Sequence, residues 1–340
     1  MISRITVKPF ELLPPCGADP QLGNGPPGPV PFASAHNILM RKRLLLAAIP
    51  LLLLADDFKL PDNCTLPFSR IATQPDPYAS CGNDGSGKAG KALTAAKIRE
   101  DNAKNNFCAD ASNPTTVDFK ILKQMQTKAP KKTTLAKNRN SLHAFFPVGD
   151  QKIGEGDVVR LVAFVKEAHI SDCSAGESVN CETPGVATND FHIPLVDPTR
   201  KNPRALAECT SVTAEMSPHF RPAAWSEIDL KTPVKNPVRV TGPLFYDDSH
   251  VPCTMVNGKL TGPGPQRISL WEIHPVYAFD VCTSTDPAQC DVASTDPGIW
   301  TPYDQWVSSN AASVQPTGQT QRTTCTKKPA RKPAPKKKKP

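Results

Sequence analysis

The feature that most restricts the fold of this chain is the run 267–282, which reads RISLWEIHPVYAFDVC. It is the densest stretch of strand-forming residues in the protein, and successive side chains of a strand point to opposite faces. On that spacing Trp271 and Ile273 share one face. The opposite face carries Ile268, Leu270, Glu272 and His274. A strand with apolar residues on both faces is typical of a strongly coiled barrel strand rather than of a flat, half-wet sheet.

Four further strands are predicted ahead of this run. They cover residues 157–170, 190–196, 209–216 and 237–246. In the second of them three apolar residues alternate inward, which leaves Asp190 and His192 outward. Gly242 allows a bend or a bulge in the fourth. A short helix, with a proline at its start, is expected at 222–230 between the third and fourth strands.

This order of elements decides between two all-β architectures. Five strands with a helix between the third and the fourth is the order of an OB-fold, a small Greek-key barrel. A β-sandwich, the rival, usually has seven or more strands. The 37 prolines and 19 glycines argue against a mostly helical chain. We therefore predict a mainly β fold with a five-stranded OB-like barrel over residues 151–290.

A small, loop-rich and helical unit is predicted ahead of the barrel, over residues 56–150. Residues 89–107 are rich in helix formers and lack proline. A second helix is expected over 117–128, with Thr116 as its cap and apolar residues at positions 119, 122 and 125. The basic stretch 128–140 is interpreted as a solvated loop in preference to a polyanion contact.

The N-terminal region has the pattern of an export signal. Three basic residues follow Met40, an apolar run covers 44–54, and the small residue Ala55 comes next, which predicts a signal peptide at 40–55. The run is too short for a stable transmembrane anchor, which needs about 20 apolar residues. Residues 1–39 are expected to be an over-extended start or a disordered leader. A periplasmic or secreted protein follows from this interpretation.

Positive charge is concentrated at the other end of the chain. The protein has 40 Lys and Arg against 32 Asp and Glu, and the two counts become equal without residues 327–340. This tail is expected to be disordered, to follow an extension and linker at 291–326, and to contact polyanions, including nucleic acid through the tail only. Its basic residues are Lys327, Lys328, Arg331, Lys332, Lys336, Lys337, Lys338 and Lys339.

The eleven cysteines indicate an oxidising compartment. If Cys16 is lost with the leader, ten remain, an even number that permits complete pairing. The disulfide candidates are Cys81, Cys108, Cys173, Cys181, Cys282 and Cys290. Cys81 and Cys108 bracket the first helix, Cys173 and Cys181 close a loop, and a short loop returns from Cys282 to Cys290.

Carboxylate and imidazole side chains on the predicted strands are the usual ligands of zinc and other transition metals. Glu272 and His274 share a face of one strand, as Asp190 and His192 do of another. If the two strands are neighbours, these four residues could bind a divalent metal. Glu215 and His250 belong to the same polar group. The chain has no HExxH motif, and solvent-facing polar residues are the favoured interpretation.

Three stretches resemble an uncharacterised family of exported bacterial proteins. They are VRVTGPLFYDDSH at 238–250, WEIHPV at 271–276 and KNNFCA at 104–109. The resemblance covers about residues 80–283, and it implies an OB-like fold and export but no established activity. Such proteins tend to have Trp after the glycine that Gly242 matches. Pro243 stands there in this chain, which argues against a ring-stacking role at that position.

No nucleophile motif accompanies these features, since GxSxG and CxxC are both missing from the sequence. We therefore predict a binding or interaction module of the cell envelope, without a cofactor, rather than an enzyme. Its expected partner is an anionic polymer, a saccharide or an envelope protein. The expected ligand-binding residues are Trp271, Glu272, His274 and Arg239. The alternatives are a metal-dependent hydrolase that uses the Asp/His/Glu group and a divalent metal, and a structural envelope protein.

Overall fold

The computed structural model describes most of the region between residues 78 and 310. The described residues are 78–86, 93–131, 135, 138–170, 176–200, 208–222, 225, 235–256, 259–261 and 267–310. The predicted leader, signal peptide and basic tail, most of the helix expected at 222–230, and Cys173 lie outside them. Within the described part of the chain, no helix has the length and apolar character needed to cross a membrane.

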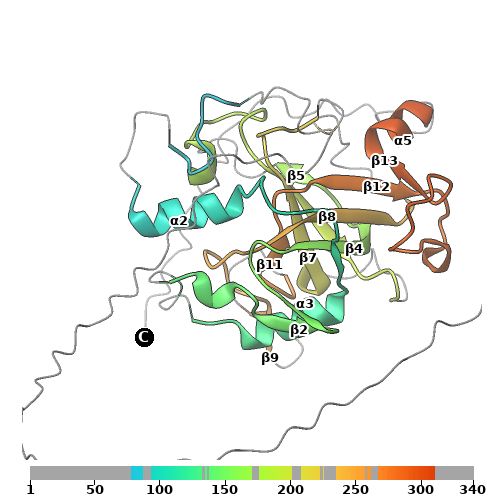
Figure 1. Ribbon diagram of the computed structural model, residues 1–340, viewed down its shortest axis with the longest axis horizontal. Coiled ribbons are helices and arrows are strands. Elements are labelled where there is room, and N and C mark those ends of the chain that lie inside the picture. Colours follow the sequence, from blue (N-terminus) through green and yellow to red (C-terminus); the bar gives the residue numbers. More distant parts are fainter. Residues whose placement is uncertain are drawn as a thin grey trace, which may run out of the picture. The chain divides into compact units, whose positions relative to one another are not determined.

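The centre of the fold is a closed barrel of five strands (Figure 1). Its members are β4 (Val158–Val165), β6 (Phe191–Val196), β7 (Ser211–Met216), β8 (Val238–Tyr246) and β11 (Trp271–Ile273). They follow one another around the barrel in the order β4, β6, β7, β11 and β8, and β8 pairs with β4 to close the ring. Only the β7–β11 pairing in this ring is parallel. The predicted mainly β, five-stranded barrel is confirmed.

Every second side chain along the strands points inward and fills the barrel with apolar residues. Ile193 lies opposite Ala214, Ala214 opposite Ile273, and Ile273 opposite Leu244, so four strands contribute to one apolar layer. All four residues are at most 1% exposed. Burial of such a layer is the main favourable contribution to folding, at about 25 cal/mol per Å² of apolar surface. The residues next to them along β6, β7 and β11 therefore point to the outer face of the barrel.

The run 267–282 is two strands rather than the single strand that was predicted. It contains β11 and β12 (Ala278–Cys282), with a cis peptide bond between His274 and Pro275 in the connection. Both pair with β8, β11 along residues 244–246 and β12 along residues 238–241. A Cβ atom at Gly242 would lie 2.4 Å from the carbonyl oxygen of Pro275. The glycine thus permits a close backbone approach where the chain changes partners.

β12 continues away from the barrel to an edge strand and a short helix. β13 (Trp300–Pro302) pairs with β12, and α5 (Tyr303–Ser309) follows it. The ring of Tyr303 packs edge-on against Phe279 of β12. The first part of the expected extension at 291–326 therefore adds regular structure to the sheet.

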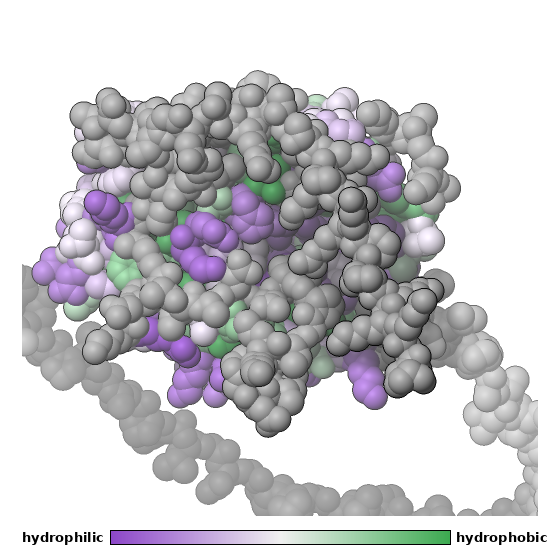
Figure 2. All heavy atoms as spheres, turned by 180° about the vertical axis from the view of Figure 1, so that it is seen from behind, coloured by the Kyte–Doolittle hydropathy of each residue, from purple (hydrophilic) through white to green (hydrophobic). Residues whose placement is uncertain are grey.

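On the molecular face shown in Figure 2, hydrophilic and hydrophobic side chains are interspersed among the coloured residues.

The predicted first strand is likewise divided, into β4 and β5 (His169–Ile170), and β5 pairs with β6. Short strands complete the described structure. They are β1 (Thr115–Thr116), which pairs with β4, the hairpin of β2 (Phe146–Val148) and β3 (Gln151–Ile153), and the hairpin of β9 (Thr254–Val256) and β10 (Lys259–Thr261).

The described part of the predicted helical unit contains helices α2 (Ala95–Lys104) and α3 (Phe119–Lys128). α2 is shorter than expected because Thr94, whose hydroxyl accepts the N–H of Lys97, caps its start. α3 is capped by Asp118 and not by Thr116, which lies in β1. The three apolar residues predicted on α3 are confirmed as buried. Short 3-10 turns lie at Asn140–Leu142, Ser178–Asn180, Glu208–Thr210 and Pro287–Gln289.

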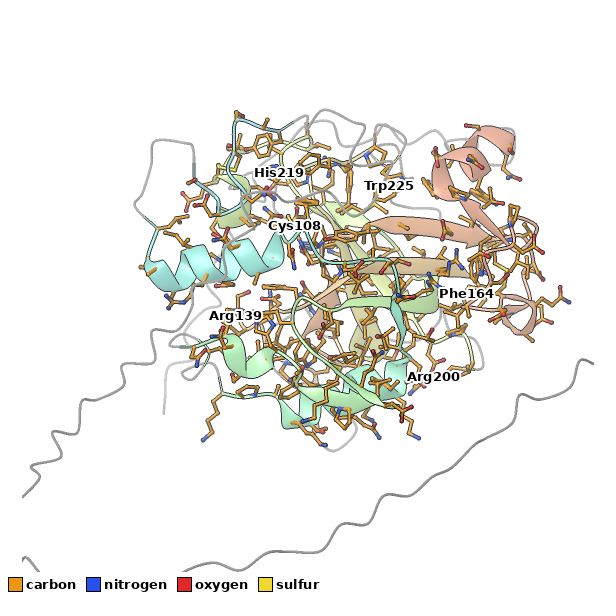
Figure 3. The ribbon with its side chains drawn as sticks, in the orientation of Figure 1. Cys108, Arg139, Phe164, Arg200, His219 and Trp225 are labelled. Carbon is orange, nitrogen blue, oxygen red and sulfur yellow. A yellow bond between two sulfur atoms is a disulfide. The ribbon has the colours of Figure 1, made fainter. Side chains whose placement is uncertain are left out.

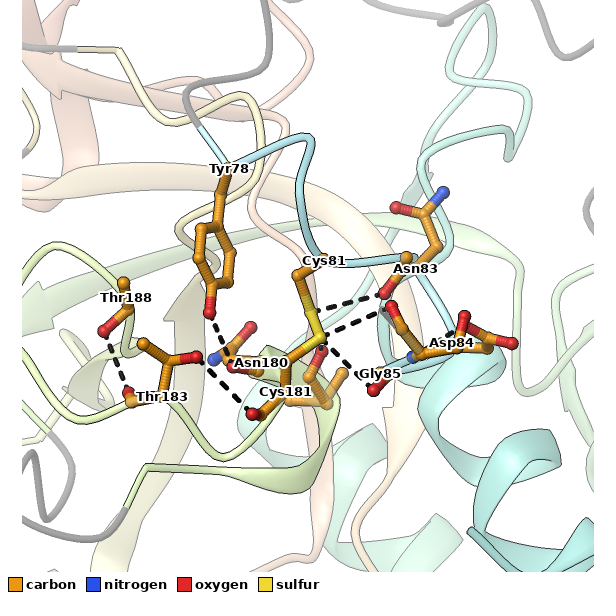
Figure 4. The surroundings of a disulfide bond; sticks show 12 residues. Tyr78, Cys81, Asn83, Asp84, Gly85, Asn180, Cys181, Thr183 and Thr188 are labelled. Carbon is orange, nitrogen blue, oxygen red and sulfur yellow. Dashed lines mark hydrogen bonds between the residues drawn. A yellow bond between two sulfur atoms is a disulfide. The ribbon is translucent and has the colours of Figure 1, made fainter. Parts of the chain in front are cut away.

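The described disulfides join Cys81 to Cys181, Cys209 to Cys253, and Cys282 to Cys290. The expected Cys81–Cys108 and Cys173–Cys181 pairs are therefore wrong, although Cys108 is also disulfide-bonded. The reason is a contact between segments far apart in the sequence, which residue spacing does not reveal. The Tyr78 hydroxyl donates to the Asn180 carbonyl at 2.9 Å, and this places Cys81 beside Cys181 (Figure 4).

We predict unequal losses of stability when these disulfides are removed. Cys81→Ser with Cys181→Ser opens a loop of 100 residues, for which chain entropy gives about 4–5 kcal/mol. Removal of the Cys282–Cys290 pair, separated by 8 residues, should lower the free energy of unfolding by only about 2–3 kcal/mol. Urea denaturation of the two double variants checks the order, which equal losses would contradict.

Candidate functional site

The outer face of β6, β7 and β11 carries a group of charged side chains. His192 lies directly opposite Glu215, and His274 immediately follows β11. Asp190, Glu215, Glu272 and His274 are at most 1% exposed. The interpretation that these residues face solvent is therefore wrong. The reason is that α2 and the turn Ser178–Asn180 cover this face of the barrel, which local sequence patterns do not show.

Three of these residues converge on one point. The side-chain atoms of Asp190, Glu215 and His274 lie within 4.8 Å of one another. His274 Nε2 is 3.3 Å from Asp190 Oδ2 and 3.4 Å from Glu215 Oε2. Lys104, the last residue of α2, brings its Nζ to 2.9 Å from Glu215 Oε2 and 3.3 Å from Asp190 Oδ2. We call Asp190, Glu215, His274 and Lys104 the buried ionic cluster.

The second polar atom of Asp190, Glu215 and His274 contacts a neighbouring group on the side away from the other two residues. Asn180 Nδ2 donates to Asp190 Oδ1 at 3.0 Å, and His192 Nε2 lies 3.2 Å from Glu215 Oε1. His274 Nδ1 donates to the Lys104 carbonyl at 2.5 Å. These contacts fix the orientation of both carboxylates and the imidazole, so that Oδ2, Oε2 and Nε2 face one another.

Mutual attraction keeps the groups of this region charged despite their burial. Burial favours the neutral amine, but the carboxylates of Glu177, Glu215 and Asp190 raise the pKa of Lys104 well above its usual value. Burial opposes ionisation of Asp190 and Glu215 too, but Lys104 and the neighbouring imidazoles hold the pKa of both carboxyls well below the usual range. Their ionised forms therefore persist across the neutral pH range.

His192 is charged for the same reason. Burial favours its neutral form, but the carboxylates of Glu215 and Glu177 raise its pKa to about 10. Its Nε2 lies 3.5 Å from Glu177 Oε1. His192 consequently acts as a positively charged neighbour of the cluster.

A second ion network separates Glu272 from the buried ionic cluster. Arg267 pairs with Glu272 and reaches Asp247 Oδ2 at 3.3 Å, and Asp247 also pairs with His250. The expected set of Asp190, His192, Glu272 and His274 is thus brought together only in part. His250 belongs to this second network as well. The convergent carboxylate beside Asp190 is that of Glu215, which lies on β7 between β6 and β11.

Arg139, labelled in Figure 3, joins the N-terminal segment to the barrel. Its guanidinium donates to both oxygens of Glu155 and, at 2.8 Å, to the Tyr246 carbonyl. It also lies 5.1 Å from the ring centre of Phe245. The interpretation of 128–140 as a solvated loop therefore fails at this residue, which is 7% exposed.

A pocket of about 220 Å³ opens beside the buried ionic cluster. α2 and the turn at 178–180 contribute its walls, and β6, β7 and the segment 245–250 contribute the rest. It is lined by Lys97, Glu100, Asp101, Lys104, Glu177, Ser178, Val179, His192, Glu215, Phe245, Asp247, Ser249 and His250. Lys104 and Glu215 belong both to the pocket and to the cluster, so the two are continuous.

Two of the expected ligand-binding residues have structural contacts instead. Trp271 is fully buried in the barrel core, against the rings of Tyr246 and Phe145. Arg239 donates to Asp280 and lies over the ring of Trp300. Neither lines the pocket.

Three residues of the site, Lys104, Asp101 and Glu177, were not predicted from the sequence. Lys104 is the first residue of the KNNFCA stretch, whose family resemblance was the one sequence signal near this part of α2.

Comparison of the chain with protein families, curated proteins and solved structures found no match. The chemistry of the pocket and the cluster therefore carries the functional argument.

We predict that Asp101 makes the protein less stable as the pH rises. Its side chain is fully buried, and burial raises its pKa to about 6. The folded state thus holds a proton that the unfolded state releases near pH 4. Between about pH 4 and pH 6 the free energy of unfolding should fall by about 2–3 kcal/mol from this group.

Asp101→Asn should remove that component and be the more stable form at pH 8, as measured by urea denaturation across the pH range. Asp150→Asn, at an exposed turn, is the matched control and should follow the wild type. A pH profile of Asp101→Asn identical to that of the wild type would show that burial does not perturb this carboxyl.

Proposed function

We propose that this protein is an exported binding module whose ligand enters the acidic pocket beside the barrel. The observation that carries the proposal is the lining of that pocket, which places five carboxylates against two lysines and the charged His192. Its position supports the proposal too, because the outer face of the second and third strands of OB barrels is a recurrent ligand surface. Here these strands are β6 and β7, which contribute His192 and Glu215.

The charge of the pocket favours a ligand that carries a positive group, such as a lysine or arginine side chain of a peptide. Lys104 and His192 neutralise part of the carboxylate charge at the base of the pocket. Glu100 and Glu177 lie nearer the surface, with side chains 18% and 21% exposed. A cationic group in the pocket would gain from these carboxylates and from the low-dielectric walls around them.

The surface argues for polar rather than apolar recognition. Among the residues whose side chains are described, Val251 is the only large hydrophobic one that is exposed. The barrel therefore offers little apolar area to a partner. Of the partners expected from the sequence, a basic segment of an envelope protein fits the pocket, while an anionic polymer is the natural partner of the basic tail.

Export is part of the same proposal. The residues at 40–55 have the composition of a signal peptide. The three described disulfides are of a kind that persists in oxidising compartments. Together they support a periplasmic or secreted location, where the tail could attach the protein to polyanions.

We predict that the pocket selects basic peptides. A fluorescein-labelled tetra-arginine peptide should bind the full chain and, equally well, a chain that ends at Thr326, as measured by fluorescence anisotropy. A tetra-glutamate peptide should not bind the shortened chain, which lacks the basic tail. Glu100→Gln with Glu177→Gln removes two carboxylates from the pocket and should weaken binding at least about tenfold, or 1.4 kcal/mol.

The matched control is Asp150→Asn with Glu182→Gln, which makes the same change in charge at exposed positions and should leave the affinity unchanged. Equal affinity of all three proteins would place the peptide outside the pocket. Binding of neither peptide would reject the ligand class and favour a structural role.

The tail has a separate predicted outcome. The full chain should bind an anionic polysaccharide such as heparin, with a logarithmic salt slope of up to about −6 if all eight basic residues take part. A chain that ends at Thr326 should lose this binding and keep tetra-arginine binding. Retention of heparin binding after truncation would assign polyanion attachment to the folded body instead.

A further inference from the structure

We propose that Asp190, Glu215 and His274 bind a divalent transition metal, with zinc as the best candidate. The site adjoins the pocket through Glu215, which lines it, and it does not depend on the peptide ligand proposed above. Imidazole and carboxylate groups are zinc ligands. The proposal rests on the arrangement of these three side chains and of the groups behind them.

The distances between the three side chains suit a tetrahedral ion. Two ligand atoms of one tetrahedral zinc, each about 2.0–2.2 Å from the metal, are about 3.3–3.6 Å apart. His274 Nε2 lies 3.3 Å from Asp190 Oδ2 and 3.4 Å from Glu215 Oε2. The first of these contacts is also a hydrogen bond, which holds the imidazole and the carboxylate together when no metal is bound. Both distances from the imidazole therefore match edges of a zinc tetrahedron, and all three ligand atoms lie within 4.8 Å of one another.

The groups behind these side chains match the outer shell of a metal site. A metal-binding imidazole typically donates its second N–H to a carbonyl or carboxylate, which fixes the tautomer and directs the other nitrogen to the metal. His274 Nδ1 donates in this way to the Lys104 carbonyl. Asn180 and His192 hold the far oxygens of Asp190 and Glu215. Glu215 Oε2 is buried, and the described groups that face it are the Lys104 ammonium at 2.9 Å and the His274 imidazole at 3.4 Å.

Lys104 gives the cluster a positive charge when no metal is bound. Its Nζ lies against both carboxylates, where it balances charges that would otherwise be costly to bury. Lys104 also lines the pocket, so its flexible side chain has space to turn away from the carboxylates. A metal ion would then take over the role of the ammonium group and bind His274 in its neutral form.

Three protein ligands leave a fourth coordination position for zinc. Glu215 and Lys104 line the pocket, so we expect this fourth position to face the pocket. Structural zinc sites are usually closed by four protein ligands, whereas catalytic sites keep one position for water or substrate. The geometry points to an open site, in which the ion is accessible to a group bound in the pocket.

Titration of the metal-free full chain tests the site. Isothermal calorimetry with Zn²⁺ should give one equivalent, and Co²⁺ should give the visible d–d absorption of tetrahedral coordination. His274→Gln and Asp190→Asn should each weaken binding by about 100-fold or more, and Asn180→Ala, behind Asp190, by about tenfold. Lys104→Met removes the competing ammonium group and should tighten binding about tenfold. Near-UV circular dichroism verifies that each variant is folded.

The matched control is His143→Gln, an exposed histidine outside the cluster, which should bind like the wild type. Unchanged binding by folded His274→Gln would assign the metal to another place and overturn the proposal. No stoichiometric binding by the wild type would also overturn it, whatever Lys104→Met does. Neither result would affect tetra-arginine binding, whose variants, Glu100→Gln and Glu177→Gln, lie outside the three proposed ligands.

Discussion

The ion pairs between Lys104 and the carboxylates of Asp190 and Glu215 are the interaction on which the described arrangement depends. They join the end of α2 to β7 and to the residue that precedes β6, across the outer face of the barrel. Charges buried in this way are costly one by one and are tolerated because each has a partner. Loss of the lysine would leave His274 as the remaining partner that the two buried carboxylates share, and α2 would lose both ion pairs with the barrel.

A close backbone contact at Gly242 is the second constraint. β8 pairs with β4 along one edge and with β11 and β12 in turn along the other. The chain can leave the barrel between β11 and β12 because Gly242 has no Cβ to strike the Pro275 carbonyl. The His274–Pro275 bond lies at this crossing. The same short segment therefore completes the barrel and presents His274 to the cluster.

Local patterns in the sequence were sufficient for the barrel but not for the site. Alternation correctly placed Trp271 and Ile273 on one face of the strand, which the structure shows to be the inner face, and the order of strands predicted the ring. The Cys81–Cys181 pair and the position of Lys104 depend on contacts between distant segments, which no local pattern records. For the same reason Glu272 was grouped with His274, although Arg267 binds it. Alternation identifies a face, and only packing determines what covers it.

The parallel pairing of β7 with β11 has a consequence for how the chain is made. β11 is the last barrel strand in the sequence and lies between β7 and β8, the two barrel strands that precede it. A ribosome or a translocation channel releases the other four barrel strands first. The edges of β7 and β8 that pair with β11 therefore lack this partner until residues 271–273 emerge. Such non-local closure is slow and exposes unpaired strand edges to aggregation. A chaperone that binds the nascent protein until β11 is released would therefore protect these edges from aggregation.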